Sequence, residues 1–109
     1  SLRFFDLVSP QNNLIRRLGI LALDLDDETK RLLPPLRRNQ GVIVAAPTAD
    51  ASVLGQQLHP GDVIYSLNGK AVASIQDLRQ LVRDLGYGEP AVFQVERERK
   101  LTYLTMQVD

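Results

Sequence analysis

The sequence has no cysteine, no tryptophan and a single histidine, and its 109 residues carry 13 Lys and Arg against 13 Asp and Glu. Without cysteine there is neither a disulfide framework nor thiolate chemistry, and the redox compartment stays open. A net charge of zero argues against a nucleic-acid partner, because phosphate contacts need basic residues gathered on one face. No apolar run approaches the roughly 20 residues that span a bilayer, and no signal peptide is recognisable. These absences predict one soluble domain.

The sequence also contains few candidate catalytic residues. His59 lies in His59-Pro60-Gly61-Asp62, a sequence typical of a tight turn. No serine stands in a Gly-x-Ser-x-Gly setting, so hydrolysis by this chain is not expected. The acidic run at 24–28 resembles a set of oxygen ligands for a hard metal ion, but Asp26 as a helix N-cap followed by two acidic residues explains it better. We therefore expect no catalytic residue, no metal and no cofactor.

Apolar patterning predicts five strands and two to three helices. The strands are expected at 18–23, 42–46, 63–67, 91–95 and 101–106. The helices are expected at 27–33, at 51–57 after an Asp50 cap, and from Ser74 to a stop at Gly86. Asn68-Gly69 predicts a tight turn with positive φ angles. The order of elements is that of a small α+β domain, a partly open barrel or sandwich with helices at its ends.

Three segments carry more specific expectations. Residues 1–13 combine a short apolar stretch with turn-forming residues and are interpreted as the end of a linker. Leu32 and Leu33 are hypothesised to fold back over Leu21 and Leu23 and to cover the second face of the first strand. The alternating charges at 96–100 are predicted to form the solvated tip of a hairpin.

Residues 58–70, Leu-His-Pro-Gly-Asp-Val-Ile-Tyr-Ser-Leu-Asn-Gly-Lys, closely resemble the L-x-P-G-D-V-I-x-x-V-N-G-K signature of PDZ domains, in particular those of HtrA/Deg-type serine proteases. Upstream, residues 17–20 are similar to the family's carboxylate-binding loop, and the resemblance covers residues 16–108. It implies a PDZ-like fold in the permuted bacterial strand order, with residues 14–109 as the domain. Where many relatives have Asp-Gly in the final hairpin, this chain has Glu98-Arg99.

The resemblance also implies a site, in which a hydrophobic peptide adds as a strand and its terminal carboxylate meets backbone amides. The carboxylate-binding loop is then Arg16, Arg17, Leu18, Gly19 and Ile20, and the groove is lined by Leu21, Ala22, Leu23, Ile75, Arg79 and Val82. The two loop arginines either add charge beside the carboxylate or are solvated arginines before a strand. Ile75 and Val82 face either the groove or the ordinary core, and Arg79 is expected to favour an acidic residue in the peptide.

On this resemblance, the chain is a peptide-binding module of a periplasmic or otherwise extracytoplasmic bacterial serine protease that works in protein quality control. Its partners are C-terminal or unfolded hydrophobic peptides and a covalently linked protease domain. The parent is expected to be a homo-oligomer and the isolated domain a monomer. Two alternatives stay open: a scaffold or secretion-system PDZ domain that takes no free C-terminus, and a PDZ domain of another peptidase class. A neighbouring segment covering residues 18–23 would favour the scaffold.

Overall fold

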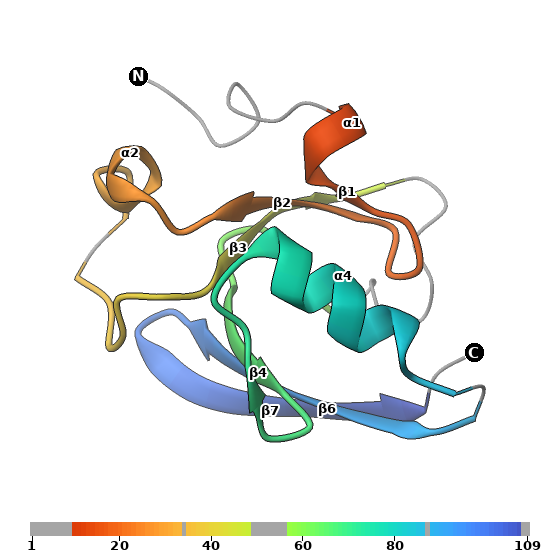
Figure 1. Ribbon diagram of the computed structural model, residues 1–109. Coiled ribbons are helices and arrows are strands. Elements are labelled where there is room, and N and C mark those ends of the chain that lie inside the picture. Colours follow the sequence, from red (N-terminus) through yellow and green to blue (C-terminus); the bar gives the residue numbers. More distant parts are fainter. Residues whose placement is uncertain (1–9, 34, 49–56, 87, 108–109) are drawn as a thin grey trace.

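The five expected strands form one antiparallel sheet in the computed structural model, which describes residues 10–33, 35–48, 57–86 and 88–107 (Figure 1). They are β2 (Ile20–Asp24), β3 (Val42–Pro47), β4 (Val63–Leu67), β6 (Pro90–Arg97) and β7 (Lys100–Gln107). Two strands of two residues were not expected, β1 (Leu14–Ile15) and β5 (Lys70–Ala71). The sheet order is β1-β2-β3-β4-β6-β7, with β5 paired to β4. The predicted α+β arrangement of five main strands with helices is confirmed.

The described helices are α1 (Pro10–Asn13), α2 (Asp27–Lys30) and α4 (Ile75–Arg83). Asp26 caps α2 as expected, since its carboxylate accepts a hydrogen bond from the backbone N of Thr29 at 2.8 Å. The helix ends at Lys30, earlier than the predicted residue 33. Ser74 caps α4, and this helix stops before the predicted Gly86. The helix expected at 51–57 lies almost wholly outside the described residues.

Helix α4 closes the core against the curled sheet. Figure 1 shows β2 on one side of this helix and the β6–β7 hairpin on the other. The main cluster joins apolar residues of β1, β2, β3, β4, β6 and α4, including Ile15, Leu18, Ile20, Leu67, Ile75, Leu78, Val82 and Phe93. Burial of this apolar surface is the main stabilising contribution to the fold.

A second apolar cluster lies around Tyr65, with Leu23, Leu25, Ile43 and Val63. Leu33 packs against this cluster, to which Leu23 belongs, in agreement with the hypothesis that it folds back toward this side of the sheet. Leu21 and Leu32 are half-buried and do not belong to the cluster. The segment after α2 therefore contributes one leucine of the expected pair to the cluster that contains Leu23.

The hairpin between β6 and β7 corrects the prediction for the charge run. Glu98 and Arg99 form its exposed tip, with φ angles of 52° and 69°. Glu96, however, is buried: one carboxylate oxygen accepts from the Tyr65 hydroxyl at 2.6 Å and from the backbone N of Arg37 at 3.0 Å. A charge can be buried when hydrogen bonds replace its water, and sign alternation along the sequence does not reveal such partners.

The turn predictions are confirmed at both positions. Asn68 and Gly69 have φ angles of 52° and 79° between β4 and β5. In the turn at 59–62, Gly61 has a φ of 94°, and the Asp62 carboxylate accepts from the backbone N of His59 at 2.8 Å.

Among the described residues, no helix is long and apolar enough to cross a membrane.

Candidate functional site

A tight loop at residues 16–19 joins β1 to β2. Gly19 has a φ of 70°, in the left-handed region where a Cβ is unfavourable, which explains the glycine. Its backbone N donates to the carbonyl of Ile15 at 2.8 Å and to that of Arg16 at 3.2 Å. Its carbonyl accepts from the backbone N of Thr48 at 2.7 Å and from the Thr48 hydroxyl at 3.0 Å. The loop is thus held on both sides, by β1 and by the end of β3.

Strand β2 has partners on both of its edges. One edge pairs with β3, and the other pairs with β1, with residues 14–15 opposite residues 20–21 in antiparallel register. The side chain of Asn13 extends this contact, because its amide N donates to the carbonyl of Ala22 at 2.8 Å. The edge that the sequence predicts to receive a peptide therefore holds a segment of the same chain.

Helix α4 borders this segment on the other side. One guanidinium N of Arg79 donates to the carbonyls of Asn12 and Leu14, each at 2.9 Å. Ile15 is 2% exposed and belongs to the same buried cluster as Ile75 and Val82 of the helix. The segment thus has the backbone of β2 along one side and the side chains of α4 along the other.

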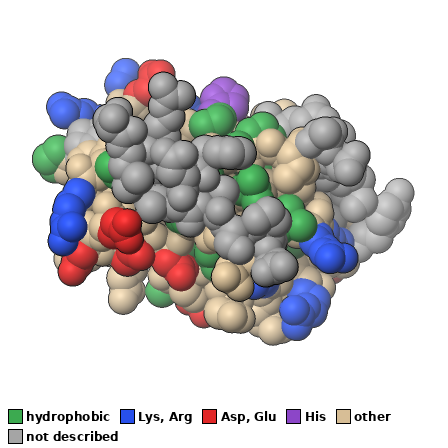
Figure 2. Space-filling model, turned by 90° about the horizontal axis from the view of Figure 1, so that it is seen from above, with side chains coloured by type: hydrophobic (Ala, Val, Ile, Leu, Met, Phe, Trp, Pro, Cys, Tyr) green, Lys and Arg blue, Asp and Glu red, His purple; other side chains and the backbone are tan. Residues whose placement is uncertain are grey.

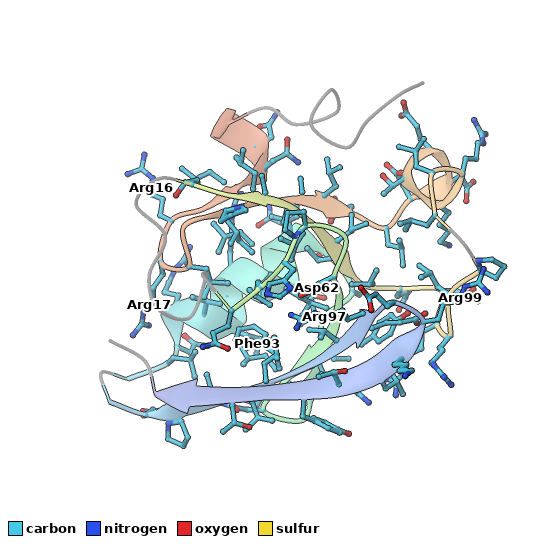
Figure 3. The ribbon with its side chains drawn as sticks, turned by 180° about the vertical axis from the view of Figure 1, so that it is seen from behind. Arg16, Arg17, Asp62, Phe93, Arg97 and Arg99 are labelled. Atoms are coloured by element: carbon cyan, nitrogen blue, oxygen red, sulfur yellow. The ribbon has the colours of Figure 1, made fainter. Side chains whose placement is uncertain are left out.

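The two arginines of the loop have different surroundings. One guanidinium N of Arg17 donates to the carbonyls of Val82 and Leu85, at 2.6 and 2.5 Å, and so satisfies acceptors at the C-terminal end of α4. Arg16 is exposed, and Figure 3 shows it directed outward at this end of the molecule. Arg17 therefore has a structural partner that its position in the sequence did not reveal.

A pocket of about 470 Å³ adjoins the segment. It is lined by Leu14, Ile15, Arg16, Arg17, Arg79, Val82 and Arg83. Four of these seven residues are arginines and none is acidic, although the whole chain is neutral. On the face shown in Figure 2, basic and acidic side chains both occur, with hydrophobic ones between them. Apolar walls and guanidinium groups together suit a ligand that has both apolar surface and negative charge.

Apart from Arg16, Arg17 and Gly19 of the loop described above, the predicted site residues fall into three groups. Leu18, Ile20, Ala22, Ile75 and Val82 meet in the main cluster, around Ile15. Arg79 and the half-buried Leu21 lie beside β1, whereas Leu23 belongs to the second cluster. Sequence reasoning missed residues 12–15. Their only signal is the apolar pair Leu14-Ile15 at the end of a polar stretch.

A second hollow, of about 650 Å³, lies near the turn at 59–62 and contains the ion pair between Asp62 and Arg97 (Figure 3). The Asp62 carboxylate binds the backbone N of His59 within the turn, and Arg97 joins this carboxylate to the end of β6. Within the described parts of the chain, His, Asp and Glu side chains do not gather in a group able to hold a metal ion.

Comparison with known proteins identifies the family of the chain and its fold. The family model described as PDZ domain matches residues 17–108. Among curated proteins, a probable periplasmic serine endoprotease DegP-like of Pseudomonas putida is 29% identical over 92 residues, and one of Pseudomonas savastanoi pv. phaseolicola is 30% identical over 93 residues. Each alignment covers 84% of this chain and 18% of the relative. The extracytoplasmic location expected from the sequence agrees with these periplasmic relatives.

Two solved structures share the fold. The HtrA-type protease AlgW with decapeptide has a TM-score of 0.69 at 23% identity, over 83% of this chain and 27% of that one. The HtrA3 PDZ domain bound to a phage-derived ligand has a TM-score of 0.64 at 16% identity, over 84% of this chain and 80% of that one. At these identities the similarity establishes the architecture. The chain spans about a fifth of its curated relatives, which have 18% of their length covered.

Proposed function

Since the chain belongs to the PDZ domain family, we propose that it captures hydrophobic peptide C-termini as an added strand in the groove between β2 and α4. One observation carries the proposal: the groove already accommodates a hydrophobic strand, β1, with Ile15 buried at its end. A peptide in the same place finds backbone partners on β2 and an apolar pocket beside Ile75 and Val82. Both kinds of recognition are those of strand addition.

The loop at residues 16–20 supplies the contacts for a carboxylate on this proposal. The Gly19 amide already donates to a carbonyl oxygen at the end of β1, so an acceptor in that place is well positioned. A carboxylate there accepts stronger, charge-assisted hydrogen bonds than a neutral carbonyl does. The arginines of the adjoining pocket, Arg16 and Arg83 in particular, favour negative charge in the last residues of the peptide.

The curated relatives support a role within a larger protein. They are serine endoproteases of which this chain matches a small part. On this proposal, residues 14–109 are a PDZ domain that feeds substrates to, or regulates, a covalently linked protease domain, and residues 1–13 are the connection. The isolated domain is a monomer without catalytic activity of its own, and the parent is a homo-oligomeric serine endopeptidase.

One observation favours a second candidate. The edge of β2 is covered by residues 13–15, which is what we expect of a scaffold PDZ domain that takes no free C-terminus. Such a domain would use other surfaces for its partner. The two candidates differ in whether any peptide C-terminus enters the groove.

Calorimetric titration with peptides ending in Val, Ile or Phe, and with their C-terminally amidated forms, tests the proposal. We expect dissociation constants on the order of micromolar for the free acids, and clearly weaker binding of the amides. Arg83→Ala should weaken the free acids, whereas Arg31→Ala, an exposed arginine after α2, serves as the matched control. Equal affinity for acid and amide would reject carboxylate capture, and no binding of either would favour the scaffold.

A further inference from the structure

We propose that residues 12–15 are an intramolecular occupant of the groove, and that a peptide binds only after displacing them. This inference rests on the proposed function and adds a form of regulation to it. The domain then exists in a closed state, with β1 on β2, and an open state that binds peptide, and ligands shift the balance between the two.

The closed state uses the contacts that an added strand would need. Residues 14–15 occupy the ladder positions opposite 20–21, and Asn13 takes the carbonyl of Ala22. A backbone group of β2 that is bonded to β1 cannot pair with a second strand. Peptide and segment therefore exclude each other along this edge.

The end of the segment also occupies the place of a terminal carboxylate. The carbonyl of Ile15 accepts from the Gly19 amide at 2.8 Å, and its side chain is buried against the helix residues Ile75 and Val82. In both respects Ile15 stands where the last residue of a bound peptide is expected. Its departure frees an apolar pocket and a backbone donor together.

The described contacts of the segment are of kinds that an incoming strand can replace, so its displacement is feasible. The ladder with β2 is two residues long, and Leu14 is only half-buried. On the outer side, the hydrogen bonds of Arg79 to the described residues go to backbone carbonyls, at Asn12 and Leu14. An incoming strand of any sequence offers equivalent carbonyls, and an apolar last residue replaces the burial of Ile15. The peptide can thus restore most of the hydrogen bonds and apolar burial that opening removes.

A reversible covalent lock tests the exclusion in the full chain. Directly opposite residues of an antiparallel pair have Cα atoms about 4.5–5.5 Å apart, within the range of roughly 4.4–6.8 Å that a disulfide bridges. Leu14→Cys with Leu21→Cys therefore fixes β1 on β2 when oxidised, and the natural chain has no cysteine that would compete. Val92→Cys with Thr105→Cys locks the β6–β7 hairpin in the same way and is the matched control.

The probe is the heptapeptide Ser-Pro-Gln-Asn-Asn-Leu-Ile, the sequence of residues 9–15 with a free carboxylate. We expect the oxidised Leu14/Leu21 variant to bind this peptide at least about tenfold more weakly than the reduced form. Loss of the pocket for one isoleucine side chain should lower the affinity by about this factor. The Val92/Thr105 control should bind equally in both redox states. Equal binding by the oxidised and reduced Leu14/Leu21 variant would overturn the inference while leaving the proposed function standing. Absence of binding by every form would instead reject the proposed function, and the inference with it.

A second pair of variants tests the equilibrium between the closed and open states without a disulfide. Asn13→Ala removes the hydrogen bond to Ala22 and should tighten binding of the same heptapeptide about two- to tenfold. Asn12→Ala keeps the backbone carbonyl that Arg79 binds, and its exposed side chain makes it the matched control, so its affinity should not change. Unchanged or weaker binding by Asn13→Ala would overturn the inference.

Discussion

The ion pair between Asp62 and Arg97 gives a sharp test of how the turn at 59–62 is held. Its two hydrogen bonds, at 2.9 Å from Nε and 2.7 Å from Nη2 of the guanidinium, join the turn to the end of β6. Asp62 also accepts from the backbone N of His59. Arg97→Met keeps most of the aliphatic part of the side chain but removes both guanidinium hydrogen bonds. Of the three hydrogen bonds to the Asp62 carboxylate, only the one from the backbone N of His59 then remains.

The expected loss of unfolding free energy depends on how exposed the two side chains are. The Asp62 side chain is 2% exposed, whereas that of Arg97 is 26% exposed. Breaking a buried pair by removing one partner costs about 3–5 kcal/mol, and the partial exposure of Arg97 allows water to replace some of its contacts. We therefore expect Arg97→Met to lower the free energy of unfolding by about 2–3 kcal/mol. Asp62→Asn should cost less, because the arginine that it leaves unpaired can reach solvent.

Urea unfolding followed by circular dichroism measures both variants and the double variant. In thermal unfolding, Arg97→Met should lower Tm by roughly 8–20 °C. The double variant should be less stable than Asp62→Asn only by the hydrogen bond from Arg97 to the carbonyl of Gln57, at 3.0 Å, which is exposed and contributes little, because the charge at position 62 is already absent. Strict additivity of the two single changes, or a loss below about 0.5 kcal/mol for Arg97→Met, would refute the reasoning.

Three further changes probe parts of the fold away from the groove. Burial, together with the hydrogen bond to Glu96, raises the pKa of Tyr65 above its ordinary value of 10.0, so the stability that it contributes is present below pH 10.0 and is lost as pH rises through the folded pKa. Tyr65→Phe should cost about 1–3 kcal/mol in neutral urea unfolding and remove this alkaline loss, and a wild-type-like curve would contradict the role of the hydroxyl. Backbone hydrogen bonding lowers the pKa of Asp26 below 3.8, so its cap stabilises above that pH and fails as pH falls. Asp26→Ala should cost about 1 kcal/mol at pH 7 and less in acid, as measured by unfolding at both pH values. Glu98→Asn with Arg99→Gly suits the two positive φ angles of the tip and should stabilise the protein by about 1 kcal/mol in thermal unfolding, whereas destabilisation would show that the side chains matter more.

The elements with their own periodicity were predictable. Each strand with an apolar core stretch, and α4 with its Ser74 cap, follows from local sequence. Strand β1 was not predictable, because two apolar residues carry no period. Its contacts include Arg79, which is 65 residues from Leu14 along the chain and binds its carbonyl. Such pairing is a property of the folded molecule.

The same limit applies to individual charged side chains. The sequence places Arg17 beside the loop glycine but does not show that its guanidinium binds the end of α4, 65 residues away at Val82. It likewise suggests that Glu96 is solvated, whereas the hydroxyl of Tyr65, across the β4–β6 pair, replaces its water. Residue type and spacing therefore indicated that Ile20 and Ala22 meet Ile75 and Val82, but they misplaced Leu23, which belongs to the second cluster. The partners of each polar atom required the three-dimensional structure.

On the proposed mechanism, self-occupation of the groove acts as a threshold for ligands. Closure lowers the apparent affinity of every peptide by the same factor, so it leaves the preference for a free carboxylate over an amide unchanged. Occupancy at a fixed peptide concentration nevertheless changes unequally. If closure weakens binding about tenfold, a peptide with a dissociation constant of about 1 μM for the open groove still binds with one of about 10 μM. A peptide with a dissociation constant of about 1 mM then has one of about 10 mM and is effectively excluded.

Internal segments of other chains resemble residues 12–15, because they offer the Gly19 amide a neutral carbonyl. They gain nothing over the tethered strand, which has the advantage of a high effective concentration. A terminal carboxylate brings a charge that the tethered strand lacks, and we therefore expect it to be the feature that opens the groove.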